Sequence, residues 1–464
     1  MASDNEDSPP SSPTGQNSEI LKLNDDCLEE IFKRLPNLQT EIYFSQVCQR
    51  FQNISLGKWR ISHTYDTMDL EKWRELLPNF DDLYYFIHQM QPFIKEMYVS
   101  SCLCTLLKDL DEIHITELPQ VTSFYYDPED VDCYPSNRSI RKLTLIVPGV
   151  RRLRLTTPTD GRYLSHFKHL QELHLYEDQH KAYELRQQYL DEVCHRCDLK
   201  VLDIRTFDGI SKLRLNNCVK SLQSLTTLKL NLATIKSVLP EIMKLPALKQ
   251  LVVLLCSEWH IPAEVSPDGY DPKIREVEEF YAIMEQKAKE IICVAVDGYY
   301  MPLEPGWDKN LPIWPHKNLQ RLAICSWDHS TDYLERYTCM KDLHLLCLRN
   351  CTHLNDDVLL KFVELCPRLQ QLDVSYCREV TPSFLSRALK ILKQKDPHRQ
   401  KSGYSKTPPL FIYYVLSGFE EFVDKENLKT SPDYQDYIVF KPDFPVRSER
   451  GLSFVDRGYQ FEFV

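Results

Sequence analysis

The chain has 464 residues, and its 56 Lys and Arg against 67 Asp and Glu give a net charge of −11. This balance disfavours a bulk nucleic-acid binder and a polybasic membrane-surface protein. Only 12 glycines occur, and no two lie closer than Gly451 and Gly458. A P-loop, a dinucleotide-binding fingerprint and a nucleophile elbow each need closely spaced glycines, so the sequence excludes all three in their usual forms.

The 16 cysteines are scattered over the whole chain, and the longest apolar stretches, 251–256 and 291–296, are too short to span a bilayer. This pattern favours an intracellular protein, cytoplasmic or nuclear, with reduced thiols over a disulfide framework.

Residues 1–18 are rich in Ser, Pro, Asp and Asn, which predicts a disordered leader. A helical module is predicted over residues 19–60, where Asn24, Asp25 and Asp26 suit the first turn of a helix. Three helices are expected: one that ends at Pro36, a short one through Leu38, and a third through Cys48 and Ile54. The first helix carries its apolar residues at the i, i+3, i+4, i+7 spacing of one helical face, Leu28, Ile31, Phe32 and Leu35.

The segment 23–51 resembles an F-box, with a leading Leu, an acidic helix start, an I-F-x-x-L core and a V-C-x-R-F run that contains Arg50. It departs from the family at Asn24, where Pro is usual. The resemblance implies that a Skp-type adaptor docks on the apolar positions Leu23, Leu28, Ile31, Phe32, Leu35, Ile42, Val47 and Phe51. Periodicity alone leaves open that the module is an N-terminal cap of the next domain.

The template L-x-x-L-x-L recurs along the chain, at a spacing that matches leucine-rich repeats. Clear copies start at Leu170, Leu199, Leu225, Leu248, Leu319, Leu343 and Leu369, and weaker ones at Ile140, Val150 and Ile210. Each unit should lay down one parallel strand and return by a helix, with Cys218, Cys351 and Cys377 facing inward at the turn. Over about residues 20–395 the chain resembles F-box/leucine-rich-repeat proteins.

The fold expected is α/β: a three-helix F-box, a helical linker over 61–90, and a leucine-rich-repeat solenoid over 91–395, with a curved parallel sheet inside and helices outside. Residues 257–318 break the pattern, as an insertion loop or as degenerate repeats. Residues 396–464 carry no repeat, and we expect them to cap the open end of the solenoid, with a partner-binding tail as the alternative.

Side chains beside the last two leucines of each template should point away from the core, onto the concave face. The basic positions there are Arg152, Arg154, Arg205, Lys212, Arg214, Lys229, Arg321 and Arg349, together with Lys142 from a weak copy. The acidic ones are Glu172, Asp203 and Asp373. This excess predicts a basic groove for an acidic or phosphorylated protein substrate, unless these residues are simply solvated side chains.

Other candidate sites have plainer interpretations. The segment Cys194-His195-Arg196-Cys197 lacks a second ligand pair, which favours structural cysteines over zinc. The pairs Asp25-Asp26 and Asp356-Asp357 stand at predicted helix starts. No metal, cofactor or catalytic residue is expected. Six aromatic residues of the interrupted region are partner anchors or packing residues: Trp259, Tyr299, Tyr300, Trp307, Trp314 and Trp327.

The resemblance implies a non-catalytic substrate receptor of an SCF-type cullin–RING ubiquitin ligase. The F-box would bind the Skp-type adaptor and, through it, cullin and RING subunits, while the solenoid holds a protein substrate. Nucleic acid and membrane are not expected partners. Two alternatives stay open: an interaction scaffold without ubiquitination, and an enzyme built on 257–318 and the tail.

Overall fold

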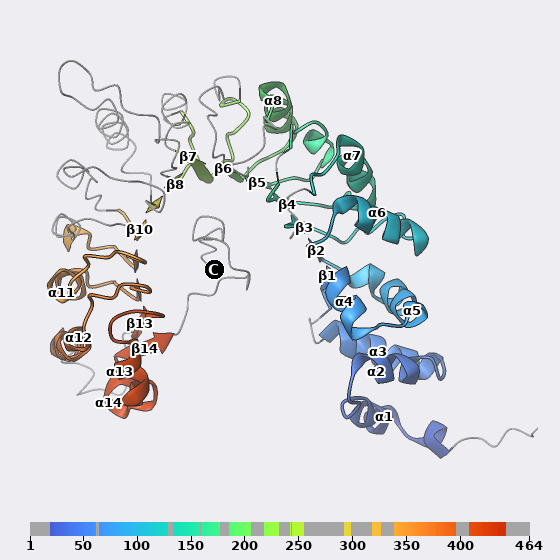
Figure 1. Cartoon of the computed structure of the whole chain (residues 1–464), viewed down its shortest axis with the longest axis horizontal. Helices are drawn as coiled ribbons and strands as arrows, with labels where there is room; N and C mark the ends of the chain where they lie inside the picture. The colour runs from blue at the N-terminus through green and yellow to red at the C-terminus, as the bar shows by residue number, and fades with distance from the viewer. Residues whose placement is uncertain are drawn as a thin grey trace, which may run out of the picture.

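The computed structural model describes residues 19–61, 65–128, 133–157, 159–176, 185–205, 218–231, 242, 244–254, 292–297, 318–325, 338–395 and 408–441. Within these residues, a helical module is followed by a 14-stranded parallel sheet. The whole forms an arc, with the strands on its inner side, the larger helices on its outer side, and the helical module at one end (Figure 1).

The N-terminal module consists of one 3-10 helix and three α-helices: η1 (Glu19–Lys22), α1 (Asp25–Phe32), α2 (Leu38–Ser45) and α3 (Gln49–Ile61). The Asn24 side chain accepts a hydrogen bond from the Cys27 N–H at 3.0 Å and caps α1. Asn37 and Thr40 form a capping box that starts α2. The helices are shorter than predicted, because α1 closes in a tight turn in which the Leu35 N–H donates to the Phe32 carbonyl at 3.0 Å. Leu35 therefore lies between helices, and Val47 and Cys48 precede α3.

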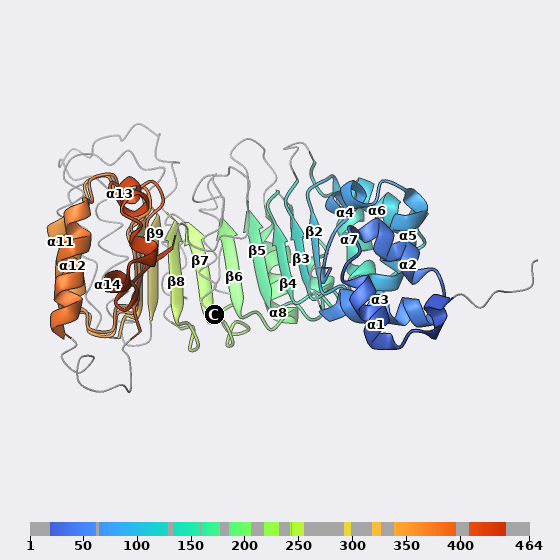
Figure 2. The same ribbon diagram turned by 90° about the horizontal axis from the view of Figure 1, so that it is seen from below.

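The strands pair in sequence order, each in parallel with the next, as Figure 2 shows from below. One residue of nearly every described strand contributes to a continuous core row, from Met68 through Leu153 and Leu228 to Ile412 and Phe440. The strands are β1 (Thr67–Asp69), β2 (Glu96–Val99), β3 (Ser123–Tyr126), β4 (Arg152–Leu155), β5 (Glu172–Tyr176), β6 (Val201–Arg205), β7 (Thr227–Asn231), β8 (Gln250–Leu254), β9 (Cys293–Asp297), β10 (Arg321–Cys325), β11 (Leu345–Cys347), β12 (Gln371–Asp373), β13 (Leu410–Tyr413) and β14 (Ile438–Lys441).

Helices connect many of the strands and bury one apolar stripe against the sheet. In α11, for example, Val358, Leu359 and Phe362 are buried, and the Asn355 side chain caps the helix ahead of Asp356. The described helices are α4 (Leu70–Leu76), α5 (Phe80–Met90), η2 (Gln91–Phe93), α6 (Leu103–Glu112), α7 (Asn137–Ile146), η3 (Leu164–His166), α8 (Gln187–Arg196), α11 (Asp356–Leu365), α12 (Pro382–Lys395), α13 (Glu420–Lys425), η7 (Leu428–Thr430) and α14 (Pro432–Gln435).

The sheet is longer than the leucine pattern indicates. It begins with β1, inside the segment expected to be a helical linker, and it continues through β13 and β14 of the expected capping tail. Strand β9 lies inside the interruption 257–318 and pairs with β8 and β10. These strands keep the spacing of the template but place Met, Phe, Val or Ile where the clear copies have Leu. The copies that start at Val150 and at the seven clear leucines are confirmed as strands.

Two of the weak copies behave differently. The Ile140 segment is helix α7, because Ser136 caps it by accepting from the Ser139 N–H and because Ile140 and Leu143 are buried at helical spacing. Lys142 is therefore a helix residue, paired with Asp111 of α6, and the prediction that it lines the concave face is wrong. The Ile210 copy, with Lys212 and Arg214, lies outside the described residues.

The turn cysteines face inward, as predicted: Cys218, Cys351 and Cys377 are fully buried. The Cys351 thiol donates to the Ile324 carbonyl at 3.3 Å, and the Cys377 thiol donates to the Leu348 carbonyl at 2.9 Å. These two thiols thus satisfy a buried carbonyl of the preceding unit, which ties successive units together.

Candidate binding surfaces of the helical module and the concave face

The apolar residues predicted to dock a partner divide into core and surface. Leu28, Phe32, Ile42 and Phe51 are buried, and the Phe32 and Phe44 rings meet edge to face at 5.6 Å. These four hold the module together. The remaining four are accessible: Leu23, Ile31 and Leu35 are half-buried, and Val47 is 58% exposed.

Four further apolar residues are exposed on the module and were not predicted, namely Ile20, Leu21, Tyr43 and Ile61. Arg50 positions one of them: its guanidinium donates to the Leu21 and Leu23 carbonyls at 3.2 and 2.6 Å and pairs with Asp25 at 2.6 Å. Leu21 therefore lies close to the start of α3, which Val47 precedes by two residues. Exposed large apolar side chains that gather in this way are typical of a protein-binding surface.

The module is fixed to the first strand–helix units. The Trp59 ring packs edge to face on Phe86 of α5 at 5.1 Å, and its Nε1 donates to Glu41 at 2.7 Å. The Ser45 hydroxyl also donates to the Tyr85 hydroxyl at 3.1 Å. Because these contacts join α2 and α3 to α5, the module has a defined orientation relative to the sheet.

The concave face carries two rows of side chains, one on each side of the core row. Strand register places Arg152 opposite Glu172 in the first row. In the second row, His174 stands opposite Asp203, and Asp203 opposite Lys229. Charged residues of opposite sign thus meet between neighbouring strands.

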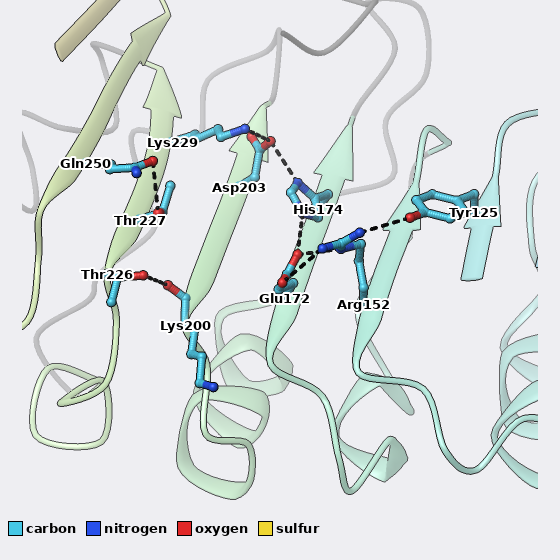
Figure 3. Close-up of polar contacts among 10 residues, drawn as sticks. All are labelled: Tyr125, Arg152, Glu172, His174, Lys200, Asp203, Thr226, Thr227, Lys229 and Gln250. Atoms are coloured by element: carbon cyan, nitrogen blue, oxygen red, sulfur yellow. Dashed lines mark hydrogen bonds and ion pairs between the residues drawn. The ribbon is translucent and has the colours of Figure 1, made fainter. Parts of the chain in front are cut away.

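Figure 3 shows the resulting chain of polar contacts from β3 to β7. Arg152 donates to the Tyr125 hydroxyl at 3.3 Å and to both carboxylate oxygens of Glu172, at 2.6 and 3.3 Å. His174 lies 4.0 Å from Glu172 and 3.0 Å from Asp203, and the Lys229 ammonium lies 3.6 Å from the same Asp203 carboxylate. Asp203 is fully buried, and His174 and Lys229 are nearly so.

Burial and charge both act on these groups. Burial raises the pKa of Glu172, but hydrogen bonds and charge from His174 and Arg152 outweigh it and lower the pKa to about 2. Burial also lowers the pKa of the Arg321 guanidinium on β10. Arg349, two residues after β11, lies 3.8 Å from Asp373 of β12, and its guanidinium lies over the Tyr376 ring at 4.9 Å.

The basic residues predicted for the groove are therefore largely engaged within the sheet. Acidic side chains pair with Arg152, Lys229 and Arg349. Arg154 and Arg321 are the other predicted groove residues whose side chains the structure describes. The side chain of Arg205, and Lys212 and Arg214 entirely, lie outside the described residues, as do the six aromatic residues proposed as anchors. The basic groove remains a prediction, on a face whose charges are more balanced than the sequence indicated.

The Cys194–Cys197 segment ends helix α8. Both thiols are buried, and the Cys197 thiol donates to the Phe167 carbonyl at 3.6 Å, while the His195 ring contacts the Asp191 carbonyl at 2.6 Å. Over the described part of the chain, no three His, Cys, Asp or Glu side chains are arranged to hold a metal. None of the described helices is both long and apolar enough to cross a membrane.

One segment of the chain matches a known protein family. Residues 20–61 match the family model of the F-box domain, in agreement with the resemblance. No curated protein matches the chain.

Among solved structures, a chain in the crystal structure of the yeast Rad7 and Elc1 complex is similar, with 19% identity and a TM-score of 0.32 over 50% of this chain and 55% of that chain. An internalin, InlF, from Listeria monocytogenes shows 10% identity and a TM-score of 0.30 over 60% and 67%. The chain thus spans about half the length of the yeast chain. These scores are too low to support an inference about function.

Proposed function

We propose that this chain is the substrate-recognition subunit of an SCF-type ubiquitin ligase. The observation that carries the proposal is the F-box match at residues 20–61, on a folded three-helix module that exposes Leu21, Tyr43 and Val47. These residues, with Leu23, Ile31 and Leu35, supply the apolar surface for a Skp-type adaptor, which links the chain to cullin and RING subunits.

The curved sheet is the substrate-binding part in this proposal. Strands in sequence order, helices outside and buried turn cysteines support its interpretation as a leucine-rich-repeat solenoid. A protein substrate lies along the concave rows, where the half-buried Arg152, Arg154 and Arg321 favour an acidic or phosphorylated segment. Arg205, Lys212 and Arg214 are further candidates from the sequence.

The chain acts by proximity and carries no catalytic residue of its own. It holds substrate lysines near a charged ubiquitin-conjugating enzyme, which saves the entropy of a bimolecular encounter. The contacts of Trp59 and Ser45 with α5 support this role, since they fix the adaptor-binding module relative to the sheet. Such a ligase would work in the cytoplasm, the nucleus or both.

Affinity purification of the full chain tests the proposal. The variant Leu21→Asp/Val47→Asp adds two charges to exposed positions, so the module should stay folded while an apolar contact with the adaptor is lost. Leu145→Asp is the matched control, because Leu145 is 68% exposed on α7, outside the module. We expect adaptor and cullin with wild type and Leu145→Asp, and neither with the double variant. Absence of both partners from the wild type would contradict the proposal.

The same experiment separates a ligase subunit from a scaffold. A scaffold would bring down the adaptor without cullin, and no protein would accumulate when the chain is depleted. Substitution of buried Leu28 is unsuitable for this test, because a charge at a fully buried position would unfold the module.

A further inference from the structure

Three thiols meet where α6 begins. Cys102 is the N-cap residue of α6, and Cys104 lies in its first turn. Their Sγ atoms are 2.9 Å apart. Cys133, on the segment that follows β3, contributes a third thiol, which hydrogen-bonds to Cys102. Cys104 is exposed, and Cys102 and Cys133 are half-buried, so small reactants can reach the group.

The two adjacent thiols differ in acidity. Burial raises the pKa of the Cys102 thiol, but contacts with the Cys104 thiol, the Cys133 thiol and the backbone amides of Cys104 and Thr105 outweigh it and lower the pKa below its ordinary value. The pKa of Cys104 is raised, first because its thiol donates to Cys102 and then by burial. Of the two adjacent thiols, Cys102 thus loses its proton more readily than Cys104, which suits Cys102 to be the nucleophile and Cys104 the second thiol.

The other cysteines show what is particular to this group. The pKa of Cys197 is raised by burial to about 11, and burial raises those of Cys293 and Cys366 to about 12. Such thiols stay protonated and inaccessible. Cys27 is the informative comparison: its thiol is exposed in the first turn of α1, where its backbone N–H donates to the Asn24 side chain.

We propose that Cys102 and Cys104 form a reversible redox site that a peroxide oxidises to a disulfide, a property beyond the proposed ligase function. The Cys102 thiolate attacks one peroxide oxygen: the S–O bond forms, the O–O bond breaks, and hydroxide leaves and takes up a proton as water. Cys104 sulfur then attacks Cys102 sulfur; the S–S bond forms and the S–O bond breaks. The hydroxide that leaves Cys102 takes the Cys104 proton and becomes the second water. Two thiols are oxidised and one hydrogen peroxide is reduced to two waters.

The surroundings keep the site in place. The Tyr126 hydroxyl donates to the Cys133 carbonyl at 2.6 Å and accepts from the Leu103 N–H at 3.3 Å. This bridge holds the start of α6 against the segment that carries Cys133. A thiol of a reducing dithiol protein would reverse the reaction by exchange, since Cys104 is exposed.

Peptide mass spectrometry of the full chain after graded hydrogen peroxide tests the proposal. Remaining thiols are blocked with N-ethylmaleimide before trypsin. Cys102 and Cys104 lie in one tryptic peptide, 96–108, and Cys133 lies in the next, 109–138. We expect peptide 96–108 to lose two hydrogens and both alkylation sites, several-fold faster than Cys27 is consumed, and to regain them with dithiothreitol.

Two variants extend the test. In Cys104→Ser, Cys102 should stop at the sulfenic acid and be labelled by dimedone, whereas Cys133→Ser should leave the disulfide between the other two intact. A cross-link of peptides 96–108 and 109–138 in place of the internal disulfide would overturn the assignment of Cys104. Oxidation of Cys102 no faster than that of Cys27 would overturn the redox site as a whole.

Discussion

Removing the Asp203 carboxylate charge should destabilise the sheet more than any surface change. Asp203 is fully buried between His174 at 3.0 Å and Lys229 at 3.6 Å, and Lys229 is itself 5% exposed. The substitution Asp203→Asn keeps the shape and leaves the Lys229 ammonium buried without its carboxylate. Breaking a buried ion pair on one side costs about 3–5 kcal/mol. For a cooperative unit of about 150–250 residues, that corresponds to a fall in melting temperature of roughly 6–20 °C.

Differential scanning calorimetry of Asp203→Asn beside Asp198→Asn measures this cost. Asp198 is exposed three residues before β6, so its substitution should change the free energy of unfolding by no more than about 0.5 kcal/mol. The double variant Asp203→Asn/Lys229→Met should regain part of the lost melting temperature, because it also removes the buried Lys229 charge. If Asp203→Asn melts within about 1 °C of the Asp198→Asn control, the pair is solvated and the reasoning is refuted.

Three further outcomes follow from contacts elsewhere in the structure. Glu172 has a pKa of about 2 against an ordinary 4.5, so its contribution to stability is complete above pH 4.5 and is lost as the pH falls toward 2. The melting temperatures of wild type and Glu172→Gln should therefore differ at neutral pH and converge in acid; a constant gap would contradict this. A Cβ at Gly418 would lie 2.1 Å from the Arg378 carbonyl oxygen, whereas one at Gly57 in α3 meets nothing within 4 Å. Urea titration should show Gly418→Ala to be strongly destabilising and Gly57→Ala to be stabilising by about 0.5–1 kcal/mol. Trp59→Ala should cost about 3–5 kcal/mol, and limited proteolysis should then cleave between α3 and α4; unchanged protease resistance would argue against the junction described here.

Leucine spacing located the central strands correctly because each template places its leucines in one core row. It missed β1, β2 and β3, where Met68, Met97 and Phe124 occupy the same positions and bury as well as leucine does. A search for any large apolar residue at this spacing would have found them. The same search would still have predicted a strand at Ile140, although that segment is a helix that Ser136 caps.

The binding surfaces were harder to predict, for a physical reason. Helical periodicity identifies an apolar face, but not whether the module itself or a partner covers it. Nothing in the sequence therefore distinguishes Leu28, which is buried, from Val47, which is exposed. Alternation along the strands predicted concave positions for Arg152, Asp203 and Lys229, which the structure places beside the core row, whereas Lys142 lies on helix α7. The pairing of the concave charges depends on register between strands about 20–30 residues apart, which a single sequence does not contain; the contact of Arg152 with Glu172 is an example.

The order of strands in the sheet has a consequence for how this molecule opens. Each strand pairs only with the strands before and after it in sequence, so a local break severs contacts with two neighbours and leaves the rest in register. Such an array behaves like a one-dimensional chain of coupled units, which can fray from a free end or separate at a weak joint while distant units stay closed. Amide hydrogen exchange should then vary by position along the arc, with protection highest where ion pairs and buried thiols join successive strands.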